Sequence, residues 1–389
     1  MNSANNDRAL TGFRVLDFSA MIAGPYCTRW LADLGADVIK VEPPEGEMMR
    51  STSPLRDGHS SYFGQLNAGK RCIALDLKDP QAMAAIVELI KVSDVLVENF
   101  RPGVMQRLGL GFAQVHAVNP RLVYCSISGY GQSGELSDRP AYAPIVHAAS
   151  GYEMAQFSFQ DDVTQPSNCG LFAADVLAAS FATIAIQSAL LQRSRTGRGQ
   201  HLDVTLMESI ASVLIYELQE AQFPAKERKP LYEPIRSSDG FVVIAPISQK
   251  NFENLCDVMA MPQWKSDPRF SSTAVRRQHW QTVLKQMREW AITRTSAQCE
   301  TLMLAAGVPC SSFKTIADML NDPHFRVRGS FNTVQDAAGL FQSLNPPFQM
   351  SDANCTTGAR VATIGQHTRE VLSELAGYTE AQLTPLAGQ

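Results

Sequence analysis

The sequence predicts an α/β protein whose larger part is built on a parallel β-sheet. Short, almost continuously apolar segments alternate with segments of helical periodicity through the first half of the chain. Strands of that kind are buried on both faces, which is typical of parallel sheets covered by helices on either side. The 389 residues suffice for two or three domains of about 150 residues each. We therefore expect a large α/β domain and a second, smaller domain.

The expected elements of the large domain follow one another in regular order. Strands are expected at residues 14–19, 37–42, 70–77, 94–99, 122–128 and 201–206. Helices are expected at residues 25–34, 79–92 and 175–193. Gly35 ends the first of these helices and Pro80 occupies the first turn of the second. A further helix is expected to carry His147, one turn after Ala143.

The composition and the hydrophobic pattern of the sequence change after about Pro224. A stretch rich in proline and lysine is followed by a predicted strand at 240–246 and by amphipathic helices at 249–259, 275–290 and 296–306. The tail carries one more helix, at 366–376, and is expected to return to the first domain. The predicted division is a large domain over 1–226, a small domain over 227–328, and a linker with a C-terminal return over 329–389.

Composition and charge argue against several classes of protein. The formal charge is −4 and no basic block stands out, so nucleic acid and membranes are poor candidates as partners. The apolar stretch 176–191 is too short and too polar to span a bilayer, and residues 1–13 lack a secretory signal. The 8 cysteines form no CxxC pair, which indicates a cytoplasmic enzyme with reduced thiols and no metal site.

The first strand–helix turn argues against a dinucleotide cofactor. It reads Ala23-Gly24-Pro25, where a dinucleotide-binding protein would carry GxGxxG to hold a pyrophosphate. The sequence also contains no P-loop, no GxSxG elbow and no metal-ligand spacing of His and Glu. Dependence on NAD is therefore not expected, and nucleophilic Ser or Cys chemistry has no local support.

Asp175 is the most informative carboxylate in the sequence. It opens a long Ala-rich helix, where the helix dipole and the free amides favour an ionised carboxylate. A nucleophile and an ordinary helix cap both fit that position, so the residues alone leave the two interpretations open. His147 by itself is better explained as a hydrogen-bonded structural histidine than as a base.

Longer motifs in the sequence indicate a protein family, which bears on the role of Asp175. They are residues 12–42 (with LDFS and AGPYCTRWLADLGADVIKVE), 67–77 (NAGKRCIALDL), 94–103 (DVLVENFRPG), 107–109, 128–134 (SGYGQSG), 196–204 (TGRGQHLDV) and IGQHTREVL from Ile364. In this order, and over nearly the whole chain, they resemble the class III CoA-transferases, the carnitine and formyl-CoA:oxalate type. That family includes the α-methylacyl-CoA racemases, and these motifs do not separate the two branches.

The resemblance implies a fold and a reaction. The fold is a Rossmann-like, CoA-binding large domain made from both termini plus a small α/β domain, in an interlocked homodimer with the active site between subunits. The reaction moves CoA from an acyl-CoA thioester to a carboxylic acid, without a permanently bound cofactor. Asp175 attacks the donor thioester, and a mixed anhydride and an aspartyl-CoA thioester follow before the acceptor acid repeats the exchange.

The resemblance also implies which residues line the site. CoA contacts are expected from Leu75, Asn99, Phe100, Arg107 and Leu108. Among them Arg107 is the natural partner of a phosphate. Residues expected to line the substrate are Tyr62, Tyr142, His147 and Arg236.

Some positions depart from the family pattern. Pro43 stands where the family has an arginine, Ile22 where a glutamine is frequent, and Ala143 where an acidic residue follows the tyrosine. The glycine-rich lid of the oxalate enzymes is missing between residues 215 and 240, which argues against oxalate as acceptor. Tyr142 replaces the racemase histidine. A transferase is therefore favoured over a racemase or lyase acting by α-proton transfer, and over a silent CoA-binding homologue.

Arg236 suggests the type of acceptor. It stands where the racemase branch has a glutamate, and together with Ala143 it makes the expected pocket more positive. A guanidinium can hold a second carboxylate in a bidentate pair, which favours a small dicarboxylic acid. The alternative is an exposed linker arginine paired with Glu233 or Asp239.

Overall fold

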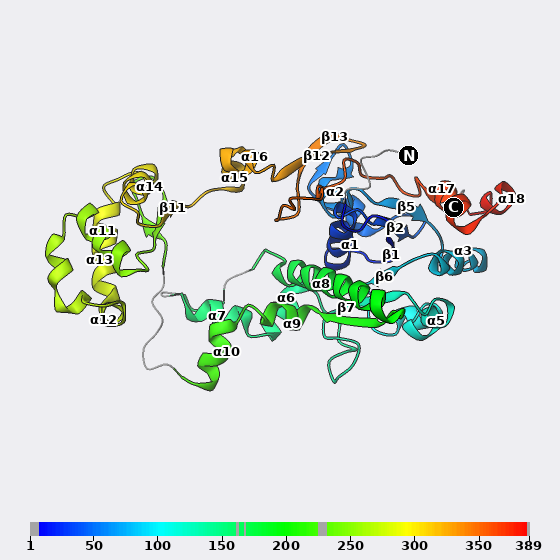
Figure 1. Cartoon of the computed structure of the whole chain (residues 1–389), viewed down its shortest axis with the longest axis horizontal. Coiled ribbons are helices and arrows are strands. Elements are labelled where there is room, and N and C mark those ends of the chain that lie inside the picture. Colours follow the sequence, from blue (N-terminus) through cyan, green and yellow to red (C-terminus); the bar gives the residue numbers. More distant parts are fainter. Residues whose placement is uncertain (1–7, 161–162, 167–168, 225–231, 387–389) are drawn as a thin grey trace. The chain divides into compact units, whose positions relative to one another are not determined.

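The computed structural model describes residues 8–160, 163–166, 169–224 and 232–386 (Figure 1). The chain divides into two compact units, Met1–Ile215 with Arg326–Gln389, and Tyr216–Phe325. The predicted boundary between residues 226 and 227 lies outside the described residues. The second division of the chain falls after Phe325, whereas the sequence predicted it after residue 328.

The core of the first unit is a six-stranded sheet in which all neighbouring strands are parallel. Its strands are β1 (Arg14–Asp17), β2 (Asp37–Glu42), β5 (Arg71–Ala74), β6 (Val95–Glu98), β7 (Val123–Ser128) and β8 (His201–Thr205). Their order in the sheet is β5-β2-β1-β6-β7-β8. The predicted parallel sheet is confirmed. The order reverses between β1 and β6, and in doubly wound sheets ligands bind outside the carboxyl ends of the strands at that switch point.

Helices cover both faces of this sheet (Figure 1). On one face lie α1 (Ala23–Asp33), α6 (Ala143–Ala149), α8 (Ala173–Thr196) and α9 (Leu206–Ala211). On the other lie α3 (Pro80–Lys91), α5 (Phe112–Val118), α17 (Thr368–Ala376) and α18 (Glu380–Leu383). Successive strand residues point to opposite faces, so Val15 packs in the first cluster and Leu16 in the second. The C-terminal tail thus completes the core of the first unit.

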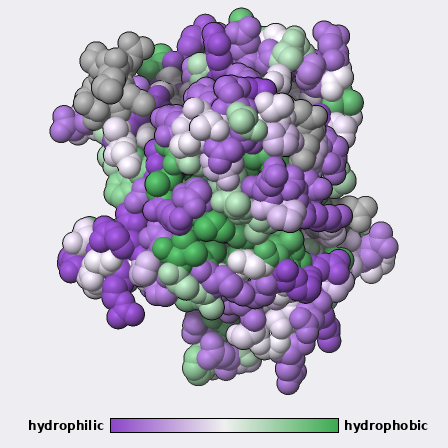
Figure 2. All heavy atoms as spheres, turned by 90° about the vertical axis from the view of Figure 1, so that its right-hand side faces the viewer, coloured by the Kyte–Doolittle hydropathy of each residue, from purple (hydrophilic) through white to green (hydrophobic). Residues whose placement is uncertain are grey.

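The helix α8 is apolar on more than one side. Ala178, Ala182 and Ile186 are buried against the sheet side, while Ile184 and Leu191 are 57% and 66% exposed. By length and composition α8 could cross a membrane, a test that core helices of soluble proteins also pass, and 44% of its most apolar window is buried. Figure 2 shows that hydrophobic residues also form a band on the face seen from the side of α3 and α5.

Shorter elements complete the first unit. They are a 3-10 turn (Met48–Ser51), β3 (Leu55–Arg56), β4 (His59–Ser60), α2 (Ser61–Asn67), α4 (Val104–Arg107), α7 (Tyr152–Ser158) and the hairpin β12 (Phe331–Asp336) with β13 (Gly339–Leu344). The hairpin was not expected from the sequence. Within β12 only Val334 is buried, so the alternation of apolar and polar residues that marks a strand is missing there.

The second unit is built around a three-stranded antiparallel sheet in the order β11-β10-β9. Its elements are α10 (Ile215–Gln222), β9 (Ile235–Arg236), β10 (Phe241–Ile244), α11 (Gln249–Val258), 3-10 turns (Pro262–Ser266 and Pro268–Phe270), α12 (Thr273–Gln278), α13 (Trp280–Ala291), α14 (Ser296–Ala305), β11 (Cys310–Ser312), α15 (Ile316–Asn321) and α16 (Pro323–Val327). The single helix expected at 275–290 is wrong, because His279, with φ −111° and ψ 19°, separates α12 from α13.

Candidate active site

Asp175 lies in the first turn of α8, at the third helical position. Its carboxyl group accepts a hydrogen bond from the backbone N–H of Ala23, the first residue of α1. Burial raises the pKa of Asp175 to about 6, against the opposing effect of this N–H and of its own N–H. Desolvation is therefore a larger effect on this pKa than the helix start named in the sequence analysis, although a carboxyl with a pKa of about 6 is still mostly ionised at neutral pH.

The segment before α1 is held in a strained, closely packed form. Met21 has φ 65°, a left-handed conformation that a residue with a side chain rarely adopts. A Cβ on Gly24 would lie 2.2 Å from Cβ of Ser19 and 3.3 Å from Cγ of Asn99, so only glycine fits. These two features place the N–H of Ala23 in front of Asp175.

Tyr62 lies close to Asp175 although 113 residues separate them in the sequence. It belongs to α2, whose first turn is capped by the Ser60 hydroxyl accepting from the N–H of Phe63. Burial raises the pKa of Tyr62, and the negative charge of Asp175 raises it further. The structure therefore places this predicted substrate residue within the range of the charge of the predicted nucleophile.

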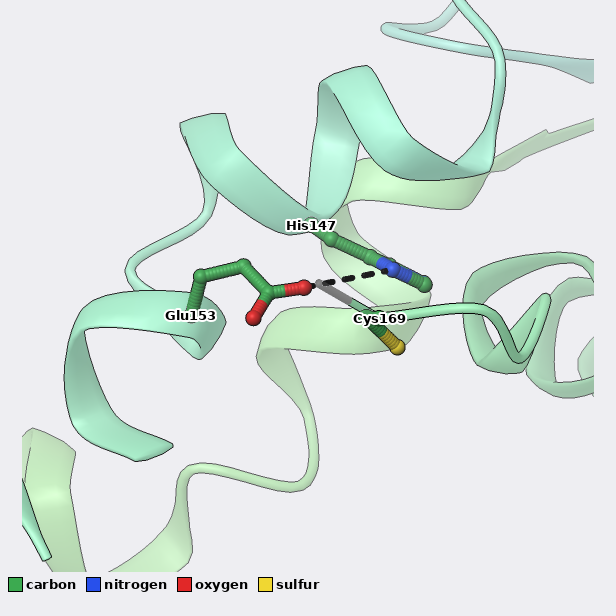
Figure 3. Close-up of side chains that lie close together, drawn as sticks. All are labelled: His147, Glu153 and Cys169. Atoms are coloured by element: carbon green, nitrogen blue, oxygen red, sulfur yellow. Dashed lines mark ion pairs between the residues drawn. The ribbon is translucent and has the colours of Figure 1, made fainter. Parts of the chain in front are cut away.

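His147 approaches Asp175 from α6. Its ring is fully buried, and Nε2 accepts a hydrogen bond of 3.1 Å from the N–H of Ala174. On the other side of the ring, Nδ1 lies 3.8 Å from Oε1 of Glu153, which comes from α7 (Figure 3). Burial lowers the pKa of His147 and Glu153 opposes that effect, so the ring is neutral near pH 7. The expected structural histidine thus contacts the residue next to Asp175.

The same group contains the strongest candidate for a metal site among the described residues. Ligand atoms of His147, Glu153 and Cys169 all lie within 4.8 Å of one another (Figure 3). The hydrogen bond from Ala174 occupies the lone pair of Nε2, however, so Nδ1 carries the proton of the neutral ring. A histidine that binds a metal through one ring nitrogen normally donates the N–H of the other nitrogen to a hydrogen-bond acceptor. Here Nε2 accepts instead, so a metal on Nδ1 would require the ring to lose its proton and become an imidazolate.

Tyr142 and Arg236 are not placed at Asp175 by any contact between described residues. Tyr142 precedes α6 and is 63% exposed, while Ala143 after it is buried. Arg236 belongs to the second unit and ends β9, with its guanidinium 5.4 Å from the centre of the Phe241 ring.

Neither acid named as an alternative partner for Arg236 pairs with it. Glu233 pairs with Arg288, and Asp239 accepts hydrogen bonds from Ser296. The alternative of an arginine paired with one of these acids is therefore wrong.

Three of the five expected CoA residues, Leu75, Asn99 and Phe100, follow the carboxyl ends of β5 and β6, and Leu108 follows α4. Leu75 follows β5, Phe100 follows β6, and both pack with Leu108 in one hydrophobic cluster. The side chain of Asn99 is used structurally: its Oδ1 accepts from the N–H of Ala20 at 2.9 Å, and its Nδ2 donates to the carbonyl of Ala20 at 2.8 Å. This clamp lies at the switch point between β1 and β6 and leads directly to the Ala23 segment.

Arg107 differs from the other four expected CoA residues. It is exposed, and its guanidinium lies over the turn at Gly103. Within the described part of the chain it has no carboxylate partner. A charged group of this kind is free to meet an anion in solution.

A buried ion pair beneath this site was missed in the sequence. Nζ of Lys70 donates to Oδ2 of Asp17 at 2.9 Å, to the carbonyl of Pro25 and to Oδ1 of Asn67. Burial alone would raise the pKa of Asp17, but Lys70 and Lys40 lower it to about 2. The LDFS and NAGK motifs contain both partners, yet nothing in the sequence shows that they pair.

A doubly wound sheet with a half-buried carboxylate beside its switch point is typical of α/β enzymes that act on a bound ligand. The model of CoA-transferase family III matches residues 10–368. The chain therefore belongs to CoA-transferase family III and is a CoA-transferase, an enzyme that uses CoA thioesters and carboxylic acids as substrates.

Relatives and solved structures agree with this family. Succinyl-CoA–D-citramalate CoA-transferase of Chloroflexus aurantiacus is 33% identical, over 99% of this chain and 98% of its own. Succinate–glutarate CoA-transferase of Agrobacterium fabrum is 31% identical, over 95% and 96%. The crystal structure of a CAIB/BAIF family protein from Brucella suis superposes with a TM-score of 0.82 at 29% identity, covering 95% of this chain and 100% of that one.

Proposed function

We propose that this CoA-transferase moves CoA from an acyl-CoA thioester to a small dicarboxylic acid, with Asp175 as the nucleophile. The observation that carries the proposal is the setting of Asp175: a half-buried carboxylate with one backbone N–H on it and the Tyr62 hydroxyl near it. Partial desolvation makes a carboxylate a better nucleophile, while a pKa near 6 leaves most of it ionised at neutral pH.

The proposed reaction consists of two equivalent halves. The Asp175 carboxylate attacks the thioester carbonyl, the C–S bond breaks, and a mixed anhydride and the CoA thiolate form. The thiolate attacks the aspartyl carbonyl, which releases the donor acid and leaves an aspartyl-CoA thioester. The acceptor carboxylate then displaces the thiolate to give a second anhydride, and the thiolate attacks the acceptor carbonyl to form the new thioester. Tyr62 can donate a hydrogen bond to the oxyanion of each addition.

CoA is proposed to lie along the carboxyl ends of β5 and β6. Phe100 and Leu108, which are partly buried, offer an apolar surface, and the exposed Arg107 offers a charge for a phosphate. Leu75 belongs to the buried core of the same cluster. Asn99 acts there through its clamp on Ala20, which links the proposed CoA surface to the segment in front of Asp175. Tyr142, which is exposed, remains a proposed substrate neighbour, whereas the ring of His147 is fully buried and contacts the N–H of Ala174.

The acceptor is proposed to be a dicarboxylic acid. The names of the two relatives contain succinate, citramalate and glutarate, all of which have two carboxyl groups. Arg236 is exposed and makes no ion pair with its neighbours Glu233 and Asp239, so its charge is available to a second carboxylate.

The proposed assembly is an interlocked homodimer. Apolar side chains of α8 that are exposed in the single chain, among them Phe181, Ile184 and Leu191, support a partner surface. A cytoplasmic location remains a prediction from the sequence.

Trapping the intermediate tests the nucleophile. With succinyl-CoA and glutarate as probes, we expect Asp175→Asn and Asp175→Ala to abolish transfer and Asp138→Asn, at an exposed carboxylate, to retain it. Hydroxylamine added with donor should convert Asp175 to a hydroxamate that mass spectrometry locates. A label on Glu153 or Asp138, or near-normal turnover of Asp175→Ala, would disprove the assignment.

A second experiment tests the acceptor. Arg236→Gln should raise the KM for a dicarboxylic acceptor, equivalent to about 1.5–3 kcal/mol for a lost charged hydrogen bond, and leave that for a monocarboxylic acid of equal length unchanged. Arg277→Gln, at an exposed arginine of the same unit, is the matched control. Equal effects of Arg236→Gln on both acids, or no effect, would contradict the proposed role.

A further inference from the structure

The helix that carries Asp175 begins without a side-chain cap. The residue before its first turn is Phe172, whose side chain makes no capping hydrogen bond. Because the first amides of any helix have no partner within the helix, they need acceptors from elsewhere. The orientation of the first turn of α8, and with it that of Asp175, therefore depends on groups outside the helix.

His147 supplies one of these acceptors from α6. Its Nε2 accepts the N–H of Ala174 at 3.1 Å, and both residues are fully buried. Ala174 directly precedes Asp175. Inside this dry environment the hydrogen bond is hard to replace by water, so loss of the acceptor would leave a buried N–H unsatisfied.

The opposite side of the ring is occupied by Glu153. Since Nε2 accepts, the proton of the neutral ring is on Nδ1, an atom that is buried and has no hydrogen-bond partner within 3.5 Å. Oε1 of Glu153 lies 3.8 Å from it, and Figure 3 shows the carboxylate directed from α7 towards the ring. The acid favours the tautomer with the proton on Nδ1, which is the one that leaves Nε2 free to accept.

We propose that His147 is a positioning residue for Asp175: its neutral imidazole, with the Nδ1 proton turned to Glu153, caps the first turn of α8 through Ala174. The role rests on the proposed function of Asp175 as nucleophile. The position of the reacting carboxyl is then set from two sides, by the N–H of Ala23 on the carboxyl itself and by the imidazole on the backbone that carries it.

Two substitutions separate capping from bulk. His147→Leu keeps an apolar side chain of moderate size without an acceptor, whereas His147→Gln can present its amide oxygen near the place of Nε2. Cys169→Ser serves as the control for the metal alternative, since Cys169 belongs to the cluster but contacts neither Ala174 nor Asp175 by a described hydrogen bond. All are made in the full chain.

The readouts are amide exchange at residues 174–176, the rate of hydroxamate formation on Asp175, and bound zinc. In His147→Leu we expect exchange roughly tenfold faster and adduct formation about 10- to 100-fold slower, with the KM for succinyl-CoA changed less than about threefold. His147→Gln should restore most of the amide protection and most of the rate of adduct formation. Cys169→Ser should match the wild type in amide exchange and in that rate.

Three results would overturn the proposal. They are wild-type exchange and rate in His147→Leu, a His147→Gln that is as impaired as His147→Leu, and stoichiometric zinc lost in both His147→Leu and Cys169→Ser. Turnover of Asp175→Asn reports separately on the nucleophile. If that variant stays active, the proposed function fails, while amide exchange still decides whether His147 caps α8.

Discussion

At the scale of single residues, the ionisation of Asp175 results from two opposing effects. Burial removes water from the carboxylate and disfavours its charge, while the N–H of Ala23 and the helix start favour it. Burial is the larger effect, so the pKa rises from 3.8 to about 6. The ionised form of Asp175 is therefore less stable in the folded protein than it would be in water. Active sites often lower the stability of a protein in this way.

This pKa predicts how the rate depends on pH. The proposed nucleophile is the anion, so the rate at which succinyl-CoA forms the aspartyl-CoA thioester on Asp175, followed by mass spectrometry without hydroxylamine, should fall as pH decreases through about 6. This decrease should be measured in single-turnover experiments, because product release does not limit the rate there. A profile that stays flat down to pH 4.5 would show that the reacting carboxyl has an ordinary pKa and contradict the structure.

The same pKa predicts a stability effect with the opposite sign to the usual carboxylate. A folded-state pKa above the unfolded value means that stability is greatest below about 4 and decreases until pH passes about 6. Asp175→Asn should therefore raise the free energy of unfolding by about 1–3 kcal/mol at pH 8 and by little at pH 4. Urea titrations measure it, with exposed Asp138→Asn as the control. An unchanged or lower stability at pH 8 would contradict the burial argument.

At the scale of elements, the start of α1 decides the geometry of the site. The turn Ala23-Gly24-Pro25 is not a dinucleotide fingerprint, but its glycine is required for another reason, the close packing of α1 against neighbouring residues. Gly24 lets α1 begin against Ser19 and Asn99, and the preceding Met21 adopts a left-handed conformation to reach that start. A pattern of residue types cannot show which atoms a missing Cβ would meet.

Gly24→Ala tests this packing. The added methyl would overlap Ser19, so α1 must shift, which should cost about 1–3 kcal/mol and move the Ala23 N–H away from Asp175. Thermal unfolding measures the loss of stability. The pH profile of aspartyl-CoA formation measures the displacement of the Ala23 N–H, through a further rise in the pKa of Asp175. Gly170→Ala is the matched control, since no described atom lies within 4 Å of its Cβ. Wild-type behaviour of Gly24→Ala would show that the overlap relaxes without consequence.

The buried pair beneath α1 gives a prediction at the same scale. Lys70→Met should leave Asp17 buried without its cation and lower stability by about 3–5 kcal/mol, whereas Lys91→Met, at the exposed Glu88–Lys91 pair, should cost less than about 1 kcal/mol. Denaturant unfolding compares the two. Similar small losses in both variants would mean that Asp17 finds another partner.

At the scale of the whole molecule, the exposed apolar residues of α8 predict an assembly. Phe181, Ile184 and Leu191 recur at helical spacing, so they lie on one face of α8. A single chain would expose this face to water, and burying it against a second chain stabilises both.

Sedimentation tests that assembly. The wild type should be a dimer at submicromolar concentration, with no folded monomer. Ile184→Glu should lower its Tm clearly more than Gln114→Glu, which adds the same charge at an exposed polar position of α5, on the other face of the sheet. A folded, active monomer would reject the interlocked dimer, and equal effects of the two substitutions would exclude this face of α8 from the interface.

The fold class and the family of this chain could both be predicted from its amino-acid sequence. Buried strands and amphipathic helices repeat a local pattern, so six strands and the long helix from Asp175 could be predicted, and the ordered motifs identified the transferase family. Three features could not be predicted from the sequence and are known from the structure: the order of the strands, the break at His279, and the groups that surround Asp175. Ala23 of α1 donates its N–H to the carboxyl, and Tyr62 of α2 lies within the range of its charge. His147 of α6 holds the neighbouring Ala174, and burial outweighs the helix start at the carboxyl of Asp175. Proximity across elements and desolvation depend on packing, which no local pattern of residues encodes.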